Sequence, residues 1–329
     1  MNKDILKNIL EPTVFEENRL PAHSDHKLFA NRNELIKGES SLYYDLNGIW
    51  KFDYSINPDS TPDGFELLNF DCKNWEDIRV PAHIQMEGYD RPHYANVAYP
   101  WDGRQELKSG QSPTDFNPVA SYVKYFTLPE SFTGKDIVLR MEGVESAAAV
   151  WLNGHYIGYC EDSFTPSEFD LSKYIVNGEN KLAIQVAKWC SGSWLEDQDF
   201  FRFSGIFRDI CLYAKPKCHL QDIGVKQIFE NNNLDKVKLD ISLTLSQSAK
   251  VKLRLYDAFD MTLKSNEFKC FFDETVVTEH DKDQVSGENN VFLEINNPKL
   301  WSAEIPNLYT LYIEIYDGDN LLEVTSVKI

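Results

Sequence analysis

The densest group of side chains able to do chemistry is an acidic cluster at residues 196–199, which reads EDQD. It runs directly into an aromatic, arginine-containing stretch at residues 200–209 (FFRFSGIFRD). Carboxylates accept hydrogen bonds from sugar hydroxyls and bind hard cations, while aromatic faces cover the apolar C–H surface of a sugar. The alternative is a solvated loop whose acids pair with Arg202 and Arg208, and sequence spacing alone favours this alternative.

Clustered carboxylates could also serve as the acid and the nucleophile of a glycosidase. Those two groups must lie roughly 5–9 Å apart across the bond being cleaved, and adjacency along the chain does not establish that separation. The chain has no GxSxG or HExxH motif and no Cys–His pairing that indicates a nucleophile. Hydrolases that depend on those motifs therefore have no support in the sequence.

Histidines and tryptophans supply two weaker candidates. His23 and His26 are spaced closely enough to approach one metal ion, but no third ligand is evident nearby. Ordinary hydrogen-bonded histidines are therefore the favoured interpretation. Trp101 and Trp194 lie beside loop acids and could stack on a sugar ring, whereas most of the remaining tryptophans lie in strand-like segments and are predicted to be buried.

Composition limits the partners and the compartment. Lys and Arg total 33 and Asp and Glu total 52, so the net charge is −19. A chain this acidic repels phosphate backbones and anionic membranes, which argues against both partners and leaves a neutral substrate compatible. No apolar stretch of about 18 residues occurs, no secretory signal is visible, and the cysteines are scattered. We therefore expect a cytoplasmic protein with reduced thiols.

The elements that must position these residues are β-strands. Apolar and polar residues alternate through 236–245 and again through 251–255, which is typical of antiparallel strands with one buried face. Asn-Gly at 153–154 and Asp-Gly at 317–318 follow such strands and favour tight hairpin turns, because these residues tolerate positive φ. Helical periodicity is scarce, and we predict an all-β fold.

Two regions lack this alternation. Residues 1–45 and about 85–120 are rich in Pro, Gly, Asn and Asp, and we interpret them as an extended arm and a long loop. A loop of that length is usually functional or an assembly element. A domain boundary is predicted near residues 215–218, where a short proline-containing link separates two series of strands.

Several sequence blocks together carry a family resemblance. They are residues 46–52 (LNGIWKF), 88–90 (GYD), 96–100 (NVAYP), 151–154 (WLNG), 166–171 (PSEFDL), 195–199 (LEDQD), 204–209 (SGIFRD) and 297–309 (NPKLWSAEIPNLY). In this order they resemble the N-terminal part of the cytoplasmic bacterial β-galactosidases of glycoside hydrolase family 2, over essentially the whole chain. The LEDQD and PSEFDL blocks resemble β-galactosidases more than the glucuronidases or mannosidases of the family.

The resemblance implies two β-sandwich domains after the N-terminal arm of residues 1–45. A jelly-roll, galactose-binding-like domain would occupy 46–217, and an immunoglobulin-like domain would occupy 218–329. In the family, a TIM barrel follows and carries both catalytic glutamates beside a magnesium site. Residue 329 corresponds to the entry into that barrel, so we expect a truncated part of a larger enzyme. This part would hold no catalytic residue and no magnesium, and it would be inactive alone.

The resemblance also assigns two site residues. The second Asp of the LEDQD block is Asp199, which in the family binds a sodium ion and contacts the galactosyl 6-hydroxyl. Hard cations take oxygen ligands, and the remaining sodium ligands would come from the barrel, so the sodium site in this chain is partial. Asp102 is assigned to a second galactose contact, although the loop around it departs from the family pattern.

Three interpretations remain open. The first is the N-terminal part of a retaining β-galactosidase that cleaves terminal β-galactosides such as lactose. Its partner would be its own catalytic barrel, and the arm would support a homo-oligomer. The second is a free-standing carbohydrate-binding module, which should bind galactose by itself. The third is a structural subunit that assembles with a separately encoded catalytic chain and binds sugar only with that chain.

Overall fold

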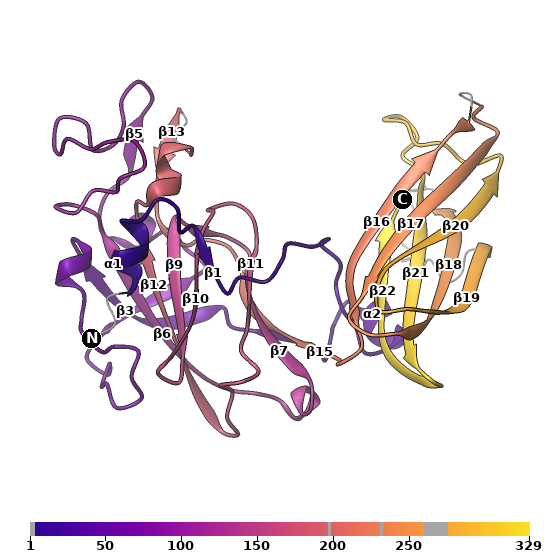
Figure 1. The fold of residues 1–329 in the computed structure, drawn as a ribbon, viewed down its shortest axis with the longest axis horizontal. Coiled ribbons are helices and arrows are strands. Elements are labelled where there is room, and N and C mark those ends of the chain that lie inside the picture. The colour runs from indigo at the N-terminus through magenta and orange to yellow at the C-terminus, as the bar shows by residue number, and fades with distance from the viewer. Residues whose placement is uncertain (1–3, 197–198, 231–232, 260–275) are drawn as a thin grey trace. The chain divides into compact units, whose positions relative to one another are not determined.

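The structure is a computed structural model that describes residues 4–196, 199–230, 233–259 and 276–329 (Figure 1). The chain forms two compact units. The first comprises Met1–Ala22 and Tyr44–Ala214, and the second comprises His23–Tyr43 and Lys215–Ile329. The N-terminal segment is therefore divided between the two units.

A seven-stranded antiparallel sheet is the larger layer of the first unit. Its strands in spatial order are β1 (Glu16–Glu17), β10 (His155–Glu161), β9 (Ala147–Leu152), β12 (Glu179–Ala187), β6 (Val119–Thr127), β3 (Gly48–Ser55) and β4 (Glu76–Val80). The interior strand β9 is buried along its whole length, and its residues are accordingly apolar throughout rather than alternating. Asn153 and Gly154 join β9 to β10, both at positive φ, as the turn prediction requires.

A four-stranded sheet and two short ribbons complete the strands of this unit. The sheet contains β11 (Ser167–Asp170), β7 (Asp136–Met141), β15 (Ile210–Lys215) and β2 (Tyr43–Asp45). The ribbons pair β8 (Val144–Glu145) with β14 (Gly205–Ile206), and β5 (His93–Ala95) with β13 (Phe200–Arg202). The core of the unit is built around large buried side chains, among them Phe65, Val123, Trp151 and Tyr159.

Short helices and the first residues of the chain complete the same unit. The helices are α1 (Asp4–Ile9) and the 3-10 turns η1 (Pro58–Ser60), η2 (Ile84–Glu87), η3 (Glu130–Phe132) and η4 (Ser191–Trp194). Ile9 is fully buried in the core, and the Ser112 hydroxyl donates to its carbonyl oxygen at 2.7 Å. No helix in the described part of the chain has the length and apolarity that a membrane crossing requires.

The second unit is a sandwich of two antiparallel sheets. One sheet contains β16 (Leu220–Ile228), β17 (Lys236–Leu245) and β20 (Gly287–Asn296). The other contains β19 (Val276–Gln284), β18 (Ala249–Phe259), β21 (Leu308–Asp317) and β22 (Asn320–Lys328). Side chains of both sheets, such as Ile241 and Leu253, share one apolar core.

Residues 23–43 form a strap on the second unit. The helix α2 (Arg32–Lys37) begins after the Asn31 cap and ends at Gly38, whose φ is 73°. The backbones of Phe29 and Val324 exchange hydrogen bonds of 3.0 and 2.8 Å. The side chain of Phe29 packs with Tyr256 and Tyr312, and α2 lies beside β22 (Figure 1). The strap therefore adds a second, smaller apolar cluster to this unit.

The prediction of an all-β chain with two β-sandwich domains is confirmed. The alternation predicted at 236–245 coincides with β17, whose residues are buried at every second position. Within the segment interpreted as a long loop, 85–120, the structure contains most of η2, the strand β5 and the start of β6. These elements are too short, or cover too little of the segment, for a hydrophobic period to be visible.

Candidate functional site

Asp199 lies at one end of the two-stranded ribbon formed by β5 and β13. The paired residues are His93 with Arg202, Tyr94 with Phe201, and Ala95 with Phe200. Asp199 directly precedes β13, so it stands beyond the Ala95–Phe200 pair, at the end that we call the tip of the ribbon. The opposite end, at His93 and Arg202, is its base. Figure 1 shows β5 and β13 side by side at the top of the first unit.

The Asp199 carboxylate is exposed and accepts a hydrogen bond from the hydroxyl of Tyr94 on the neighbouring strand. This hydrogen bond is the main cause that raises the pKa of Tyr94 above its ordinary value. Tyr94 itself is 51% exposed. The pair therefore presents oxygen atoms to solvent, the atom type that both sugar hydroxyls and hard cations accept as a partner.

The register of the ribbon places a further polar residue at its tip. Because Ala95 pairs with Phe200, Asn96 and Asp199 are the next opposed positions beyond the paired strands. Asn96 is exposed, and its amide can both donate to and accept from a hydroxyl. Neither Tyr94 nor Asn96 is predicted from the sequence, because a strand of three residues leaves no alternation to detect. The sequence feature that could have pointed to Asn96 is the family block NVAYP, which begins with this residue.

Aromatic rings surround the base of the ribbon. The ring centroids of Tyr94 and Phe201 are 5.6 Å apart, and those of Phe201 and Phe203 are 6.2 Å apart. The His83 ring stacks on Phe207 at 5.0 Å and lies 4.6 Å from Phe203. Burial lowers the pKa of His83, so this imidazole is neutral at physiological pH. The ribbon thus combines a polar tip with aromatic rings toward its base, and such a combination can accept a sugar.

Asp102 lies in a tight turn of the segment that connects β5 to β6. Its carboxylate accepts a hydrogen bond from the backbone N–H of Tyr99 at 2.9 Å, and its own N–H donates to the Tyr99 carbonyl at 3.0 Å. Among the contacts shown within the described residues, none joins Asp102 to Asp199. The assignment of Asp102 to galactose binding stays a prediction.

The tryptophans beside the acids differ in availability. Trp101 is only 2% exposed, because it packs against Tyr99 at 5.2 Å and Trp194 at 4.9 Å between ring centroids. Trp101 therefore cannot offer a face to a sugar, and that prediction is wrong. Trp194 is half-buried, and its indole N–H donates to the Gln111 carbonyl at 2.7 Å.

The acidic cluster is anchored in the fold at Glu196. The carboxylate of Glu196 accepts hydrogen bonds from the backbone N–H of Ser163 at 3.0 Å and from its hydroxyl at 2.8 Å. Burial raises the pKa of Glu196. Arg208, one expected partner of these acids, donates to the Phe164 carbonyl at 2.7 Å. Asp197 and Gln198 lie outside the described residues.

Charged groups are buried behind the base of the ribbon. The Lys188 ammonium contacts the Asp90 carboxylate, and the two side chains are 1% and 5% exposed. Burial lowers the pKa of Lys188, and Asp90 opposes that change. Burial, followed by the charge of Glu196, raises the pKa of Glu145 to about 8. Such perturbed groups occur both at functional sites and in structural ion-pair networks.

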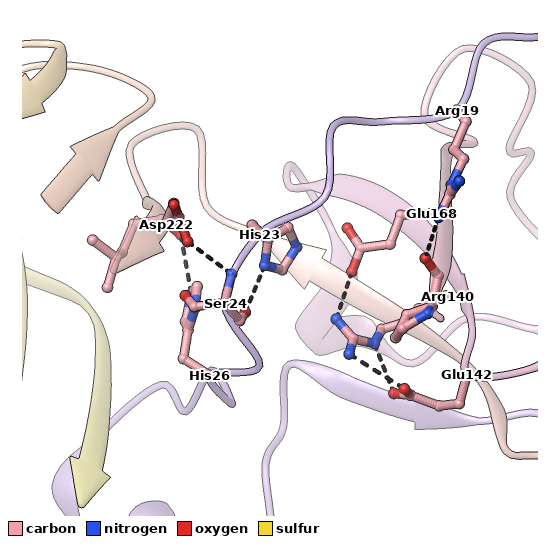
Figure 2. Close-up of polar contacts among 10 residues, drawn as sticks. Arg19, His23, Ser24, His26, Arg140, Glu142, Glu168 and Asp222 are labelled. Atoms are coloured by element: carbon pink, nitrogen blue, oxygen red, sulfur yellow. Dashed lines mark hydrogen bonds and ion pairs between the residues drawn. The ribbon is translucent and has the colours of Figure 1, made fainter. Parts of the chain in front are cut away.

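Glu168 of the PSEFDL block has a structural role. Arg140 donates to Glu168 at 3.1 Å and to Glu142 at 2.7 Å (Figure 2). The side chains of Arg140 and Glu168 are each 6% exposed. A buried, paired carboxylate of this kind is not available to a substrate.

The histidine pair of the second unit is also engaged within the fold. The Nδ1 atom of His26 lies 2.9 Å from the hydroxyl of Ser24, and Figure 2 shows both residues. The Nε2 atom of His26 lies 3.3 Å from the Leu220 carbonyl oxygen. Burial lowers the pKa of His26 to about 4, so the imidazole is neutral at physiological pH. Each of its two nitrogens then has a hydrogen-bond partner within the fold. No group of three or more His, Cys, Asp or Glu side chains among the described residues is placed to hold a metal ion.

A small cavity lies in the second unit, at one end of its sandwich. Its lining includes Leu239, Ile295, Trp301 and Tyr309, and it holds about 60 Å³. Ordinary ligand pockets measure about 300–1,000 Å³. The cavity is therefore too small for a sugar, and the ribbon tip remains the better candidate as an open surface site.

Comparison with known proteins identifies both domains. Residues 43–216 match the sugar binding domain of glycosyl hydrolases family 2, and residues 218–329 match a further domain described as glycosyl hydrolases family 2. A β-galactosidase of Halalkalibacterium halodurans is 44% identical over 321 residues, which cover 96% of this chain and 30% of that protein. The β-galactosidase large subunit of Latilactobacillus sakei is 40% identical, over 93% of this chain and 48% of that protein. The chain therefore spans less than half the length of either relative.

Solved structures agree in fold. A β-glycosidase from Bacteroides vulgatus has a TM-score of 0.64 at 21% identity, over 87% of this chain and 33% of that chain. A family 2 β-glucuronidase has a TM-score of 0.61 at 20% identity, over 88% of this chain and 30% of that chain. At about 20% sequence identity, this structural likeness shows a shared fold and does not extend to function. With one family domain matching more than half of its residues and a second matching most of the rest, the chain belongs to the glycosyl hydrolases of family 2.

Proposed function

We propose that this chain is the galactose-binding, non-catalytic part of a β-galactosidase. The observation that carries the proposal is the exposed Asp199–Tyr94 pair at the tip of the ribbon. The names of the relatives that cover nearly the whole chain support it. A galactoside is also neutral, which suits a chain with a net charge of −19.

The ribbon tip contacts the terminal galactosyl group in the assembled enzyme. Asp199 accepts a hydrogen bond from the galactosyl 6-hydroxyl and supplies one oxygen ligand to a sodium ion, a role that suits a carboxylate. One carboxylate does not complete a cation site, and as the family resemblance implies, we assign the remaining sodium ligands to the catalytic part of the enzyme. Asn96, beside Asp199, and Asp102, on the following segment, supply further contacts to sugar hydroxyls.

Cleavage belongs to a part of the enzyme outside residues 1–329. A retaining mechanism needs a nucleophilic carboxylate and an acid about 5 Å apart, and these residues, together with magnesium, lie in a catalytic barrel. The chain's own contribution is to bind and orient the galactosyl group, which lowers the barrier by reducing the freedom of the bound substrate.

The barrel is either continuous with this chain or a separate partner chain. Relatives named β-galactosidase large subunit support a catalytic partner in either form. We place the enzyme in the cytoplasm, where the cysteines that the structure describes stay reduced, and we expect the complete enzyme to be a homo-oligomer.

The test measures hydrolysis and binding with and without the catalytic part. Purified residues 1–329 should show no hydrolysis of a chromogenic β-galactoside above the buffer blank. Calorimetric titration should show galactose binding by the assembled enzyme, stronger in sodium than in potassium buffer. Turnover by the segment alone would overturn the division of labour proposed here. Galactose binding by the segment as tight as by the assembled enzyme would instead establish a free-standing carbohydrate-binding module.

A further inference from the structure

Gln85 connects the two strands of the ribbon at its base. Gln85 is buried, with only 7% of the residue exposed. Its carbonyl oxygen accepts from the Ser204 N–H at 3.0 Å, and its amide donates to the Ser204 hydroxyl at 2.9 Å and to the Asp90 carboxylate at 3.1 Å. Asp90 lies shortly before β5 and Ser204 shortly after β13. One buried amide therefore holds both chain segments where they enter and leave the ribbon.

The surroundings of Gln85 make this connection stiff. Lys188 contacts the same Asp90 oxygen that accepts from Gln85. The backbone N–H of Ile84 donates to the Ser204 carbonyl at 3.0 Å, so the turn that carries Gln85 runs beside the chain that leaves β13. Buried polar groups exchange partners only at the cost of leaving one unsatisfied, so the arrangement resists small rotations.

The ribbon itself is short, although its base is also held by Arg202, which is buried and donates to the Glu196 carbonyl oxygen. It contains three paired positions, and an isolated two-stranded ribbon is marginally stable in water. At about 3.3 Å per residue it extends roughly 10 Å from base to tip, so a change of about 10° in the angle between its two strands at the base moves their tips apart by roughly 2 Å. A displacement of about 1 Å is enough to weaken the positioning of a bound group.

We propose that Gln85 is a positioning residue for the sugar site, because its bonds to Asp90 and Ser204 hold the two strands of the ribbon at a fixed angle to each other and thereby keep Tyr94 and Asp199 within hydrogen-bond distance. Gln85 acts through the ribbon and need not touch the ligand. That the pair binds galactose rests on the proposed function, whereas the effect of Gln85 on the pair does not.

The test follows the Tyr94 hydroxyl by NMR in the chain labelled with ¹³C at the tyrosine Cζ atoms. Tyr94→Phe assigns the signal, and Asp199→Ala defines its chemical shift without the hydrogen-bond acceptor. At neutral pH, Gln85→Ala should move the Tyr94 signal most of the way to that reference. Ser204→Ala, which removes one of the hydrogen bonds to Gln85, should move it part of the way.

Asn180→Ala is the matched control. Asn180 is also a fully buried amide of the first unit, and it bonds to the Val176 backbone and to Asn153. Its replacement should lower the thermal midpoint about as much as Gln85→Ala does, because a similar set of hydrogen bonds is lost. It should leave the Tyr94 signal at the wild-type position, which separates positioning from general stability.

The outcomes separate the two proposals. A wild-type Tyr94 signal in folded Gln85→Ala overturns the positioning role, and the same result in Ser204→Ala does so if Gln85→Ala does not fold. A displaced signal together with about tenfold weaker galactose binding by the assembled enzyme supports both proposals. A displaced signal in an enzyme whose wild type binds no galactose supports the positioning role and rejects the proposed function.

Discussion

The two units of the chain bury charged side chains to different extents. In the second unit, β17 and β20 alternate buried apolar with more exposed polar residues, and the shared core consists largely of Leu, Ile and Val. In the first unit, the buried set includes many charged groups, among them Arg140, Glu145, Glu168 and Lys188. The second unit is thus held mainly by apolar contact, and the first also by directional polar contact.

The difference indicates what each unit has to fix. Apolar burial is non-directional and tolerates small shifts of one strand past another. Buried charges and amides must keep their partners, so they define angles and distances as well as contact. The first unit carries the ribbon, a short surface element whose tip must point in one direction. The polar groups at the base of that ribbon are therefore best understood as the means of orienting it.

The largest expected effect comes from breaking the buried pair in the first unit. Lys188→Met keeps the length of the side chain but leaves Asp90 buried without its cation. It should lower the free energy of unfolding by about 3–5 kcal/mol. Urea unfolding followed by tryptophan fluorescence reports on this unit, since six of the seven tryptophans belong to it.

The double variant Asp90→Asn/Lys188→Met sharpens that result. It removes both charges and keeps a side chain that can still bond to Gln85, so it should recover most of the lost stability. A loss below about 1 kcal/mol in the single variant would show that the pair is no more important than a surface salt bridge.

Truncating an apolar core residue in the second unit tests the other side of the comparison, namely that apolar burial stabilises this unit. Ile241 is fully buried in β17, and Ile241→Ala should lower the free energy of unfolding by about 2–5 kcal/mol through lost burial and the cavity left behind. Circular dichroism in urea measures this loss. Because the contact is apolar, Ile241→Val should cost only about 0.5–1.5 kcal/mol, and an equal cost for both variants would contradict the argument.

The contrast between long alternating strands and short polar elements also explains which features the sequence could predict. The β17 strand follows from alternation alone, since one face is buried and the other solvated over ten residues. The Asn-Gly turn at 153–154 follows from its need for positive φ. Asp199 is assigned through the family resemblance, because no spacing within the acidic cluster singles it out, and its role in binding stays a prediction.

The rest depended on contacts between residues that are distant in the sequence. Tyr94 and Asp199 meet only because β5 and β13 pair across more than one hundred residues. Gln85, Asp90 and Ser204 likewise converge from separate segments. No local pattern records such pairings, and the strands involved are too short for periodicity to indicate them.

A pH-dependent effect is expected from the single deeply buried acid of β22. Glu323 is 1% exposed, its Oε1 accepts from the Leu220 N–H at 2.8 Å, and burial raises its pKa to about 8. Its folded pKa lies above the unfolded value, so its contribution to stability is fully present below pH 4.5 and is lost as the pH rises toward 8. Glu323→Gln cannot ionise, so it should be more stable than the wild type by an amount that grows across this range, on the order of 2–3 kcal/mol at pH 7.

Thermal denaturation of both proteins between pH 4.5 and 8 checks this prediction. His26→Asn gives the opposite sign as a control, because the folded pKa of His26 is lowered to about 4. The wild type loses the His26 contribution as the pH falls from about 6.5 toward 4. A stability difference for Glu323→Gln that is constant with pH would show that Glu323 is ionised in the folded chain.

The smallest effect on folding, but a clear one on function, is expected at Asp199. Asp199→Asn removes the charge and keeps the shape of an exposed side chain, so the free energy of unfolding should change by less than about 0.5 kcal/mol. In the assembled enzyme, losing one charge-assisted contact should cost about 1.5–3 kcal/mol, or roughly ten- to a hundredfold in kcat/KM. The acid and the nucleophile lie elsewhere, so the loss should come through galactose affinity and sodium dependence.

The measurement is kcat/KM against sodium concentration for the wild type, Asp199→Asn and Asp102→Asn. Asp102 is already bonded to the Tyr99 backbone, so its variant should change the sodium response less. Asp197→Asn is a second comparison, expected to have the smaller effect of a neighbour in the same acidic block. If Asp197→Asn abolishes the sodium response while Asp199→Asn retains it, the site assignment is wrong. If no variant changes the response, the ribbon tip is an ordinary solvated surface, and the polar groups at its base serve stability alone.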